Sequence, residues 1–175
     1  LFMAGKTISA DADAIASGGP PRFWSELSYH RYADVSADGL RTIAARAQQY
    51  GVSTSMLEHI GSGYEDLHED LKVGNNSAWA QFALAFADED GGGLYYIVDD
   101  RNPNAPVIRP GVRTPFLAQY FRYVRPGAVR VGATSSEAAF DPVAFTNADG
   151  KAVVVVKAER AGEFVIEGLA PGAYE

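Results

Sequence analysis

The sequence predicts an α/β fold in its first part and an all-β fold in its second, and two observations carry this prediction. Before residue 127, segments with a strand pattern alternate with segments with a helix pattern, which is typical of a parallel sheet covered by helices. From residue 127 onward, short β-prone runs are separated by turn residues. The chain of 175 residues is 47% hydrophobic and 21% charged, as expected of a globular protein with a buried core. We therefore expect two domains, residues 1–126 and residues 127–175.

Charge and cysteine content exclude several classes of partner and site. The 15 Lys and Arg residues against 22 Asp and Glu residues give a formal net charge of −7, so nucleic acid is not an expected partner. No apolar run approaches the ~20 residues that cross a bilayer, so no membrane-spanning segment is expected. The chain contains no cysteine, which excludes disulfides, a thiol nucleophile and cysteine-bound zinc. We expect a monomer without cofactor or metal.

The first domain begins with two predicted strands, Lys6–Ala10 and Phe23–Tyr29, separated by a loop rich in Asp, Gly and Pro. A helix is predicted next, with Asp38 as its cap and Gly51 at its end. Its apolar positions follow helical spacing and are Leu40, Ile43, Ala44 and Ala47. The segment Val52–Ile60 is predicted to be a strand, because it is mostly apolar or small, as in strands covered on both faces.

The remainder of the first domain contains a long polar connection and three further elements. Gly61–Asn76 is predicted to be a functional loop, since it is polar and longer than most connections. A helix is predicted over Ala78–Ala87. Its core-facing stripe comprises Trp79, Phe82, Ala83 and Phe86. A strand at Leu94–Val98 follows, and Thr114 and Pro115 are suited to begin a last helix.

The second domain is predicted to consist of antiparallel strands. Ala128–Ala133 is the first strand candidate. Asp141–Phe145 and Lys151–Ala158 are predicted to form a hairpin, because the turn sequence Asn147–Gly150 separates two β-prone runs. A further strand is expected to start at Tyr174.

Several polar side chains lie at the ends of the predicted parallel strands. In β/α barrels such ends form the mouth that carries the catalytic groups. A buried polar group without a partner there costs roughly 2–7 kcal/mol, so Glu58 requires a partner or a role. One interpretation makes Glu58 a nucleophile, held ionised by Tyr32 or His30. The other makes it a structural carboxylate paired with Arg31 or His59.

A metal site in the polar connection is a further alternative. Its candidate ligands are His59, His68, Glu65, Glu69 and Asp70. They lie on one polar segment and lack the His-Glu-x-x-His spacing of a zinc helix, so a solvated acidic loop is the preferred interpretation.

The order of these segments resembles glycoside hydrolase family 30, in which a β/α barrel is joined to a β-sandwich. The resemblance rests on Ser28–Tyr32, Thr54–His59, Phe121–Ala128 and Val143–Lys151, of which Phe121–Ala128, with its Arg-Pro-Gly, is the most specific. It implies an α/β fold, namely the C-terminal part of a (β/α)8 TIM barrel followed by an antiparallel β-sandwich. Both chain ends interrupt strand-like patterns, so we expect a piece of a longer protein.

The resemblance also implies a function. Glu58, at the end of the seventh barrel strand, would be the nucleophile of a retaining hydrolase of β-linked glycans. His30, Tyr32, His59 and Tyr96 would bind the substrate, with Tyr96 on the eighth strand, where such enzymes often place a Trp. The acid/base would follow the fourth strand, typically in an Asn-Glu pair that this chain lacks, so the chain alone is expected to be inactive.

The resemblance implies an oligo- or polysaccharide as the partner and an extracellular or periplasmic location. A non-catalytic carbohydrate-binding or surface protein on the same scaffold is the alternative, because a fold does not determine a function.

Overall fold

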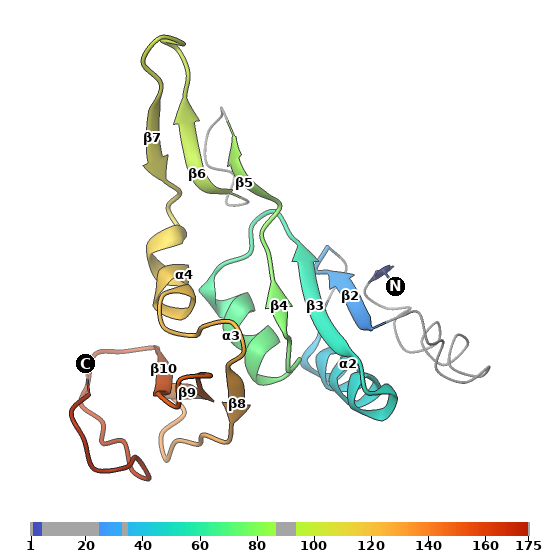
Figure 1. Cartoon of the computed structure of the whole chain (residues 1–175), viewed down its shortest axis with the longest axis vertical. Helices are drawn as coiled ribbons and strands as arrows, with labels where there is room; N and C mark the ends of the chain where they lie inside the picture. The colour runs from blue at the N-terminus through green and yellow to red at the C-terminus, as the bar shows by residue number, and fades with distance from the viewer. Residues whose placement is uncertain (1, 5–24, 33–34, 87–93, 175) are drawn as a thin grey trace. The chain divides into compact units, whose positions relative to one another are not determined.

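A computed structural model describes residues 2–4, 25–32, 35–86 and 94–174 of the chain (Figure 1). The chain divides into two compact units, Leu1–Gln119 and Tyr120–Glu175. The predicted strand Lys6–Ala10 lies outside the described residues. The predicted domain boundary at residues 126 and 127 stays a prediction.

The first unit contains a parallel sheet with one helix after each of two strands. Its strands, in spatial order, are β1 (Phe2–Ala4), β2 (Glu26–His30), β3 (Ser53–Glu58) and β4 (Ala78–Trp79). All three neighbouring pairs are parallel. Helix α2 (Ala37–Tyr50) connects β2 to β3, and α3 (Tyr64–Lys72) connects β3 to β4. The alternation predicted from the sequence is therefore present, and it brings the ends of β2, β3 and β4 to one edge of the sheet.

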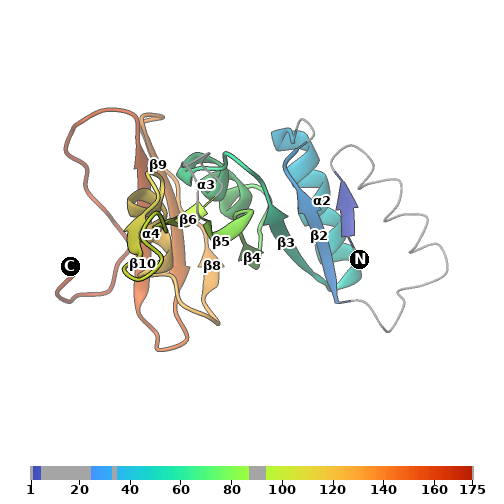
Figure 2. The same ribbon diagram turned by 90° about the horizontal axis from the view of Figure 1, so that it is seen from above.

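Helix α2 covers the sheet with the apolar stripe that the sequence predicts, and Figure 2 shows it alongside β2. The core residues from the sheet and from α2 are Leu27, Tyr29, Leu40, Ile43, Ala47 and Met56. The predicted cap is wrong by two residues, since the hydroxyl of Ser36 accepts the hydrogen bond from the Gly39 N–H. Asp38 lies in the first turn and pairs with Arg41. Gly51 ends the helix in the left-handed conformation, as predicted.

Two segments differ from their prediction. The expected polar loop contains helix α3, which starts after Gly63, where the Asp66 carboxylate accepts from the Gly63 N–H. The helix predicted over Ala78–Ala87 is instead the two strands β4 and β5 (Ala83–Phe86). Its helical spacing is overridden because the backbone around Trp79 forms hydrogen bonds to β3.

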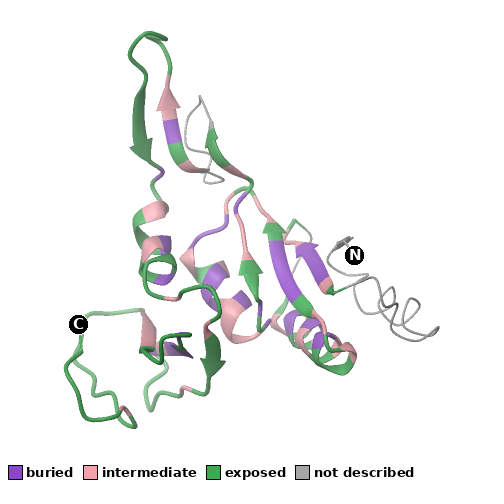
Figure 3. Ribbon diagram, viewed as in Figure 1, coloured by how far each residue is buried: buried purple, intermediate pink, exposed green. Residues whose placement is uncertain are grey.

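A second sheet of the first unit has the order β5, β6 (Leu94–Asp99) and β7 (Val107–Pro110). The β5–β6 pair is parallel and the β6–β7 pair is antiparallel. The predicted last helix is confirmed as α4 (Thr114–Phe121), and the Thr114 hydroxyl donates to the Tyr95 carbonyl. Within the first unit, buried residues are concentrated on β2, β3 and the helices (Figure 3).

The second unit contains an antiparallel sheet of β10 (Ala152–Ala158), β9 (Phe140–Thr146) and β8 (Val129–Val131), in that order. The predicted hairpin is confirmed, with Thr146 opposite Ala152 and Gly150 in the left-handed conformation of its turn. The strand expected to start at Tyr174 stays a prediction, because the described residues end there. Residues 159–174, all described, form no strand, because Pro and Gly interrupt them and Tyr174 bonds locally to the Ala170 carbonyl.

Candidate active site

The residues at the end of β2 project alternately to two sides, as expected of extended backbone. Tyr29 and Arg31 contact Asp70 of helix α3. His30 and Tyr32 contact Glu58 instead. One short segment therefore supplies a buried network on one side and the candidate site on the other.

Glu58 is turned toward His30 by an irregularity in the pairing of β2 and β3. Tyr29 pairs with Met56, but the next residue, His30, pairs with Glu58, so Leu57 has no partner in the register. In a regular strand Glu58 would project to the same side as Met56, which belongs to the core. The bulge redirects its carboxylate to the side of His30, where Nδ1 lies 3.8 Å from Oε1.

The Tyr32 hydroxyl connects Glu58 to the chain after β3. It accepts a hydrogen bond from the Ile60 N–H at 3.1 Å and interacts with the Glu58 carboxylate. Partial burial raises the pKa of Tyr32, and the neighbouring Glu58 charge raises it further. The hydroxyl therefore stays protonated at neutral pH and can donate to the carboxylate.

Three aromatic rings line this side of the strand ends. The ring of Tyr32 lies edge-on to His30 at 5.8 Å and to His59 at 5.1 Å between centroids. Nδ1 of His59 lies 2.7 Å from the Ser62 hydroxyl. Burial lowers the pKa of His59, and the positive charge of Arg31 lowers it further, so this imidazole is neutral at pH 7.

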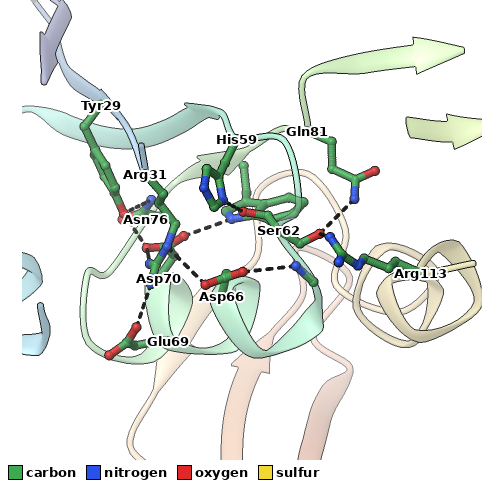
Figure 4. A network of polar contacts seen from close by, with 12 residues as sticks. Tyr29, Arg31, His59, Ser62, Asp66, Glu69, Asp70, Asn76, Gln81 and Arg113 are labelled. Carbon is green, nitrogen blue, oxygen red and sulfur yellow. Dashed lines mark hydrogen bonds and ion pairs between the residues drawn. The ribbon is translucent and has the colours of Figure 1, made fainter. Parts of the chain in front are cut away.

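Asp70 is the centre of the buried network on the other side (Figure 4). Its Oδ1 accepts from the Tyr29 hydroxyl and from the Arg31 guanidinium, each at 2.5 Å. Its Oδ2 accepts from the Trp79 indole N–H at 2.9 Å. The side chain is completely buried, and burial raises the pKa of Asp70 to about 6, although these three donors lower it.

Arg31 binds three carboxylates that α3 presents on one side. Its Nε lies 3.2 Å from Asp66, and its two terminal nitrogens bind Glu69 at 2.8 Å and Asp70 at 2.5 Å. These residues stand at the i, i+3 and i+4 positions of the helix, which share one face. Only 7% of the Arg31 side chain is exposed.

The structure changes two of the interpretations drawn from the sequence. The contacts of Glu58 are with His30 and Tyr32, whereas Arg31 binds α3, so the predicted pairing of Glu58 with Arg31 is wrong. Two of the candidate metal ligands, Glu69 and Asp70, bind Arg31 instead. Among the described residues, no group of three or more His, Asp or Glu side chains could hold a metal ion.

The position expected for Tyr96 is also wrong. Tyr96 lies on β6, in a sheet other than that of Glu58, and the strand that follows β3 in the parallel sheet is β4. Trp79 on β4 packs against the core cluster, which confirms its predicted core position on a different element. A role of Tyr96 in substrate binding stays a prediction.

Sequence reasoning named Arg31 and Asp70 in other roles and missed their pairing with each other. The available signal was the i, i+3, i+4 spacing of Asp66, Glu69 and Asp70, which becomes informative only once their segment is known to be a helix.

Comparisons with known proteins agree with this architecture. Residues 127–161 match the glycosyl hydrolase family 30 β-sandwich domain. The catalytic domain of GH30 xylanase C from Talaromyces cellulolyticus is similar, with a TM-score of 0.66 and 16% identity over 89% of this chain. SrfJ from Salmonella typhimurium is similar with a TM-score of 0.68 and 21% identity over 87% of this chain.

The chain spans 38% of the length of each of these two structures. At identities this low, the two structural matches show the fold alone. The match of residues 127–161 adds a resemblance to glycoside hydrolase family 30. No helix among the described residues is long and apolar enough to cross a membrane. The chain thus has the fold of the C-terminal part of a (β/α)8 barrel followed by a β-sandwich, and it is glycoside hydrolase family 30-like.

Proposed function

We propose that Glu58 is the nucleophile of a retaining glycoside hydrolase that cleaves β-linked glycans. The family resemblance supports a glycosidase. The observation that carries the assignment to Glu58 is the bulge at Leu57, which turns a carboxylate out of the core and toward His30 and Tyr32. Bulges of this kind re-aim side chains beside active sites.

The proposed reaction is a double displacement. The Glu58 carboxylate attacks the anomeric carbon, the glycosidic C–O bond breaks, and an acid protonates the leaving oxygen. The residue that served as the acid then acts as a base and deprotonates a water molecule. This water attacks the glycosyl-Glu58 ester and releases the sugar. That second carboxyl must lie about 5–5.5 Å from Glu58 and belongs to the upstream part of the barrel, so this chain alone is proposed to be inactive.

The neighbours of Glu58 suit this reaction. The Tyr32 hydroxyl, protonated at neutral pH, can hold one carboxylate oxygen by a hydrogen bond and leave the other aimed at the sugar. His30 and the neutral His59 can exchange hydrogen bonds with sugar hydroxyls. The partner is thus an oligo- or polysaccharide, and the location is proposed to be extracellular or periplasmic. Because one similar structure is a xylanase, xylan is the first polysaccharide to test.

The test is a comparison of the full-length protein with Glu58→Gln on 4-nitrophenyl β-xyloside, β-glucoside and β-galactoside, on glucuronoxylan and on a mixed-linkage β-glucan. The substitution should abolish sugar release, because the amide cannot form the glycosyl ester. Glu163→Gln, at an exposed position of the second unit, is the matched control and should leave activity unchanged.

Labelling of Glu58 by an activated 2-deoxy-2-fluoroglycoside, located by mass spectrometry, would identify the nucleophile directly. Activity of Glu58→Gln within a few-fold of the unsubstituted protein would refute the assignment. Glycan binding without any turnover by the full-length protein would favour the non-catalytic alternative.

A further inference from the structure

We propose that Arg31 and Asp70 are positioning residues, which hold His30 and Tyr32 against Glu58 through the backbone at the end of β2. The catalytic part of this inference rests on the proposed function. Its geometric part concerns the folded chain and can be tested without any substrate.

The first argument is the placement of Arg31 between the two residues that reach Glu58. Arg31 follows the last residue of β2, where the chain bends, and His30 and Tyr32 are bonded to it on either side. Its guanidinium is tied to helix α3 by three carboxylates in three directions. With Arg31 fixed, His30 and Tyr32 are held in the positions from which their side chains contact Glu58.

The second argument is that Asp70 connects the two strands that flank the strand of Glu58. Tyr29 belongs to β2 and Trp79 to β4, and both donate to the Asp70 carboxylate. Strand β3 lies between them in the sheet. Asp70 therefore restrains the spacing of three strand ends from a single point on α3.

The third argument is energetic. A buried ion pair is often no more stabilising than apolar residues of the same volume. Stability alone therefore does not account for the Arg31–Asp70 pair. What the planar guanidinium provides is a set of hydrogen bonds with fixed directions, which a lysine ammonium cannot reproduce. These hydrogen bonds fix the orientation of the chain after β2. The side chains that this orientation places are the ones that contact Glu58.

The experiment compares Arg31→Met, Arg31→Lys and Asp70→Asn in the full-length protein, after circular dichroism and thermal melting have established that each variant folds. Arg41→Met is the matched control, because Arg41 forms an exposed ion pair with Asp38 on α2. The protein is labelled with 3-fluorotyrosine, and the signal of Tyr32 is assigned by its loss in Tyr32→Phe. Its titration followed by fluorine NMR reports the surroundings of the Tyr32 hydroxyl.

The direction in which the pKa of Tyr32 changes distinguishes a movement of its side chain from the loss of the Arg31 charge. If Tyr32 moves away from Glu58 in Arg31→Met, its pKa falls toward that of free 3-fluorotyrosine, because burial and the Glu58 charge are what raise it. If the guanidinium is removed and nothing moves, that pKa stays unchanged or rises, because removing a positive charge can only disfavour the phenolate. We expect a fall in Arg31→Met, a smaller fall in Arg31→Lys, which keeps the positive charge, and no change in Arg41→Met. In Asp70→Asn the loss of a negative charge itself lowers the pKa of Tyr32, so that variant is judged by its kinetics alone.

Kinetics with the best substrate of the glycoside panel supply the second measurement. We expect kcat to fall at least about 10-fold in Arg31→Met with KM within about threefold, since misplacement acts on the transition state. Arg31→Lys should recover part of that loss. If Arg31→Met does not fold, Arg31→Lys decides the question by the same two measurements, because it keeps the positive charge.

An unchanged or raised pKa of Tyr32 in the folded Arg31 variants would overturn the proposal, whatever their activity, because the pair would then only stabilise the fold. A lowered pKa with unchanged kcat would overturn its catalytic part. A full-length protein that is inactive on every glycan but shows the lowered pKa would refute the proposed function and still support positioning.

Discussion

His30 lies opposite Glu58 in the sheet because the pairing of β2 and β3 shifts by one residue directly before it. The shift leaves Leu57 unpaired and reverses the side to which Glu58 projects. A carboxylate that regular pairing would bury beside Met56 thus comes to lie 3.8 Å from an imidazole. The position of the proposed nucleophile depends on this one irregularity.

The first prediction concerns the reach of the Glu58 side chain. Glu58→Asp keeps the carboxylate but withdraws it by one methylene, so the full-length enzyme should lose roughly 100-fold in kcat. Steady-state kinetics on the best aryl β-glycoside measure this, with Glu163→Asp as the control. A loss below threefold would mean that the reacting atoms do not include this carboxylate.

The second prediction concerns the Tyr32 hydroxyl. Tyr32→Phe removes one hydrogen bond to a carboxylate, which is worth about 1.5–3 kcal/mol and corresponds to roughly 10- to 150-fold in kcat. Since half of Tyr32 is exposed, the melting temperature should change little. Tyr123→Phe, at a similarly exposed position, should alter neither quantity. Equal effects of the two substitutions would contradict the role of Tyr32.

Elements whose stability is local could be predicted from the sequence. Helix α2 shows its apolar stripe and its terminal Gly51, and the β9–β10 hairpin shows its turn. The strand that ends at Glu58 could be predicted because its sequence is mostly apolar or small. In these segments local propensity and the final fold agree.

Elements that depend on distant contacts could not be predicted. Helix α3 has a polar sequence, and its acidic face is neutralised by Arg31 from β2. Strand β4 carries helical spacing, yet its backbone is bonded to β3. The bulge at Leu57 has no glycine or other local signal, so the pairing partner alone reveals it.

The third prediction is a pH dependence of stability that Asp70 contributes. Its pKa in the folded protein is raised from 3.8 to about 6, so the folded state binds this proton more tightly than the unfolded state. The corresponding stabilisation is fully present below pH 3.8 and is lost as the pH rises through 6. A shift of this size is worth about 3 kcal/mol.

Asp70→Asn removes that titration. The difference in free energy of unfolding between the unsubstituted protein and Asp70→Asn should therefore fall as the pH is raised from 4 to 7. Urea titrations of the full-length proteins at several pH values measure it, with Asp38→Asn on the surface of α2 as the control. A difference that is flat, or that rises with pH, would show that Arg31 and the other donors lower the pKa of Asp70 at least as much as burial raises it.

The last prediction concerns Asn147 in the second unit, which ties the segment after helix α4 to the hairpin turn. Its Oδ1 accepts from the Arg125 N–H at 3.0 Å, and its Nδ2 donates to the Tyr123 carbonyl at 2.8 Å. Only 8% of Asn147 is exposed, so removing the amide leaves two backbone groups without these partners.

Asn147→Ala should cost about 2 kcal/mol in free energy of unfolding, at roughly 1 kcal/mol for each lost hydrogen bond. Asn147→Asp keeps an acceptor for Arg125 but loses the donor to Tyr123, so its loss should be intermediate. Urea denaturation of the full-length protein measures both, with the exposed Asn104→Ala as the control. If Asn147→Asp is as damaging as Asn147→Ala, the bond to Tyr123 carries the connection, because that is the bond both variants lack.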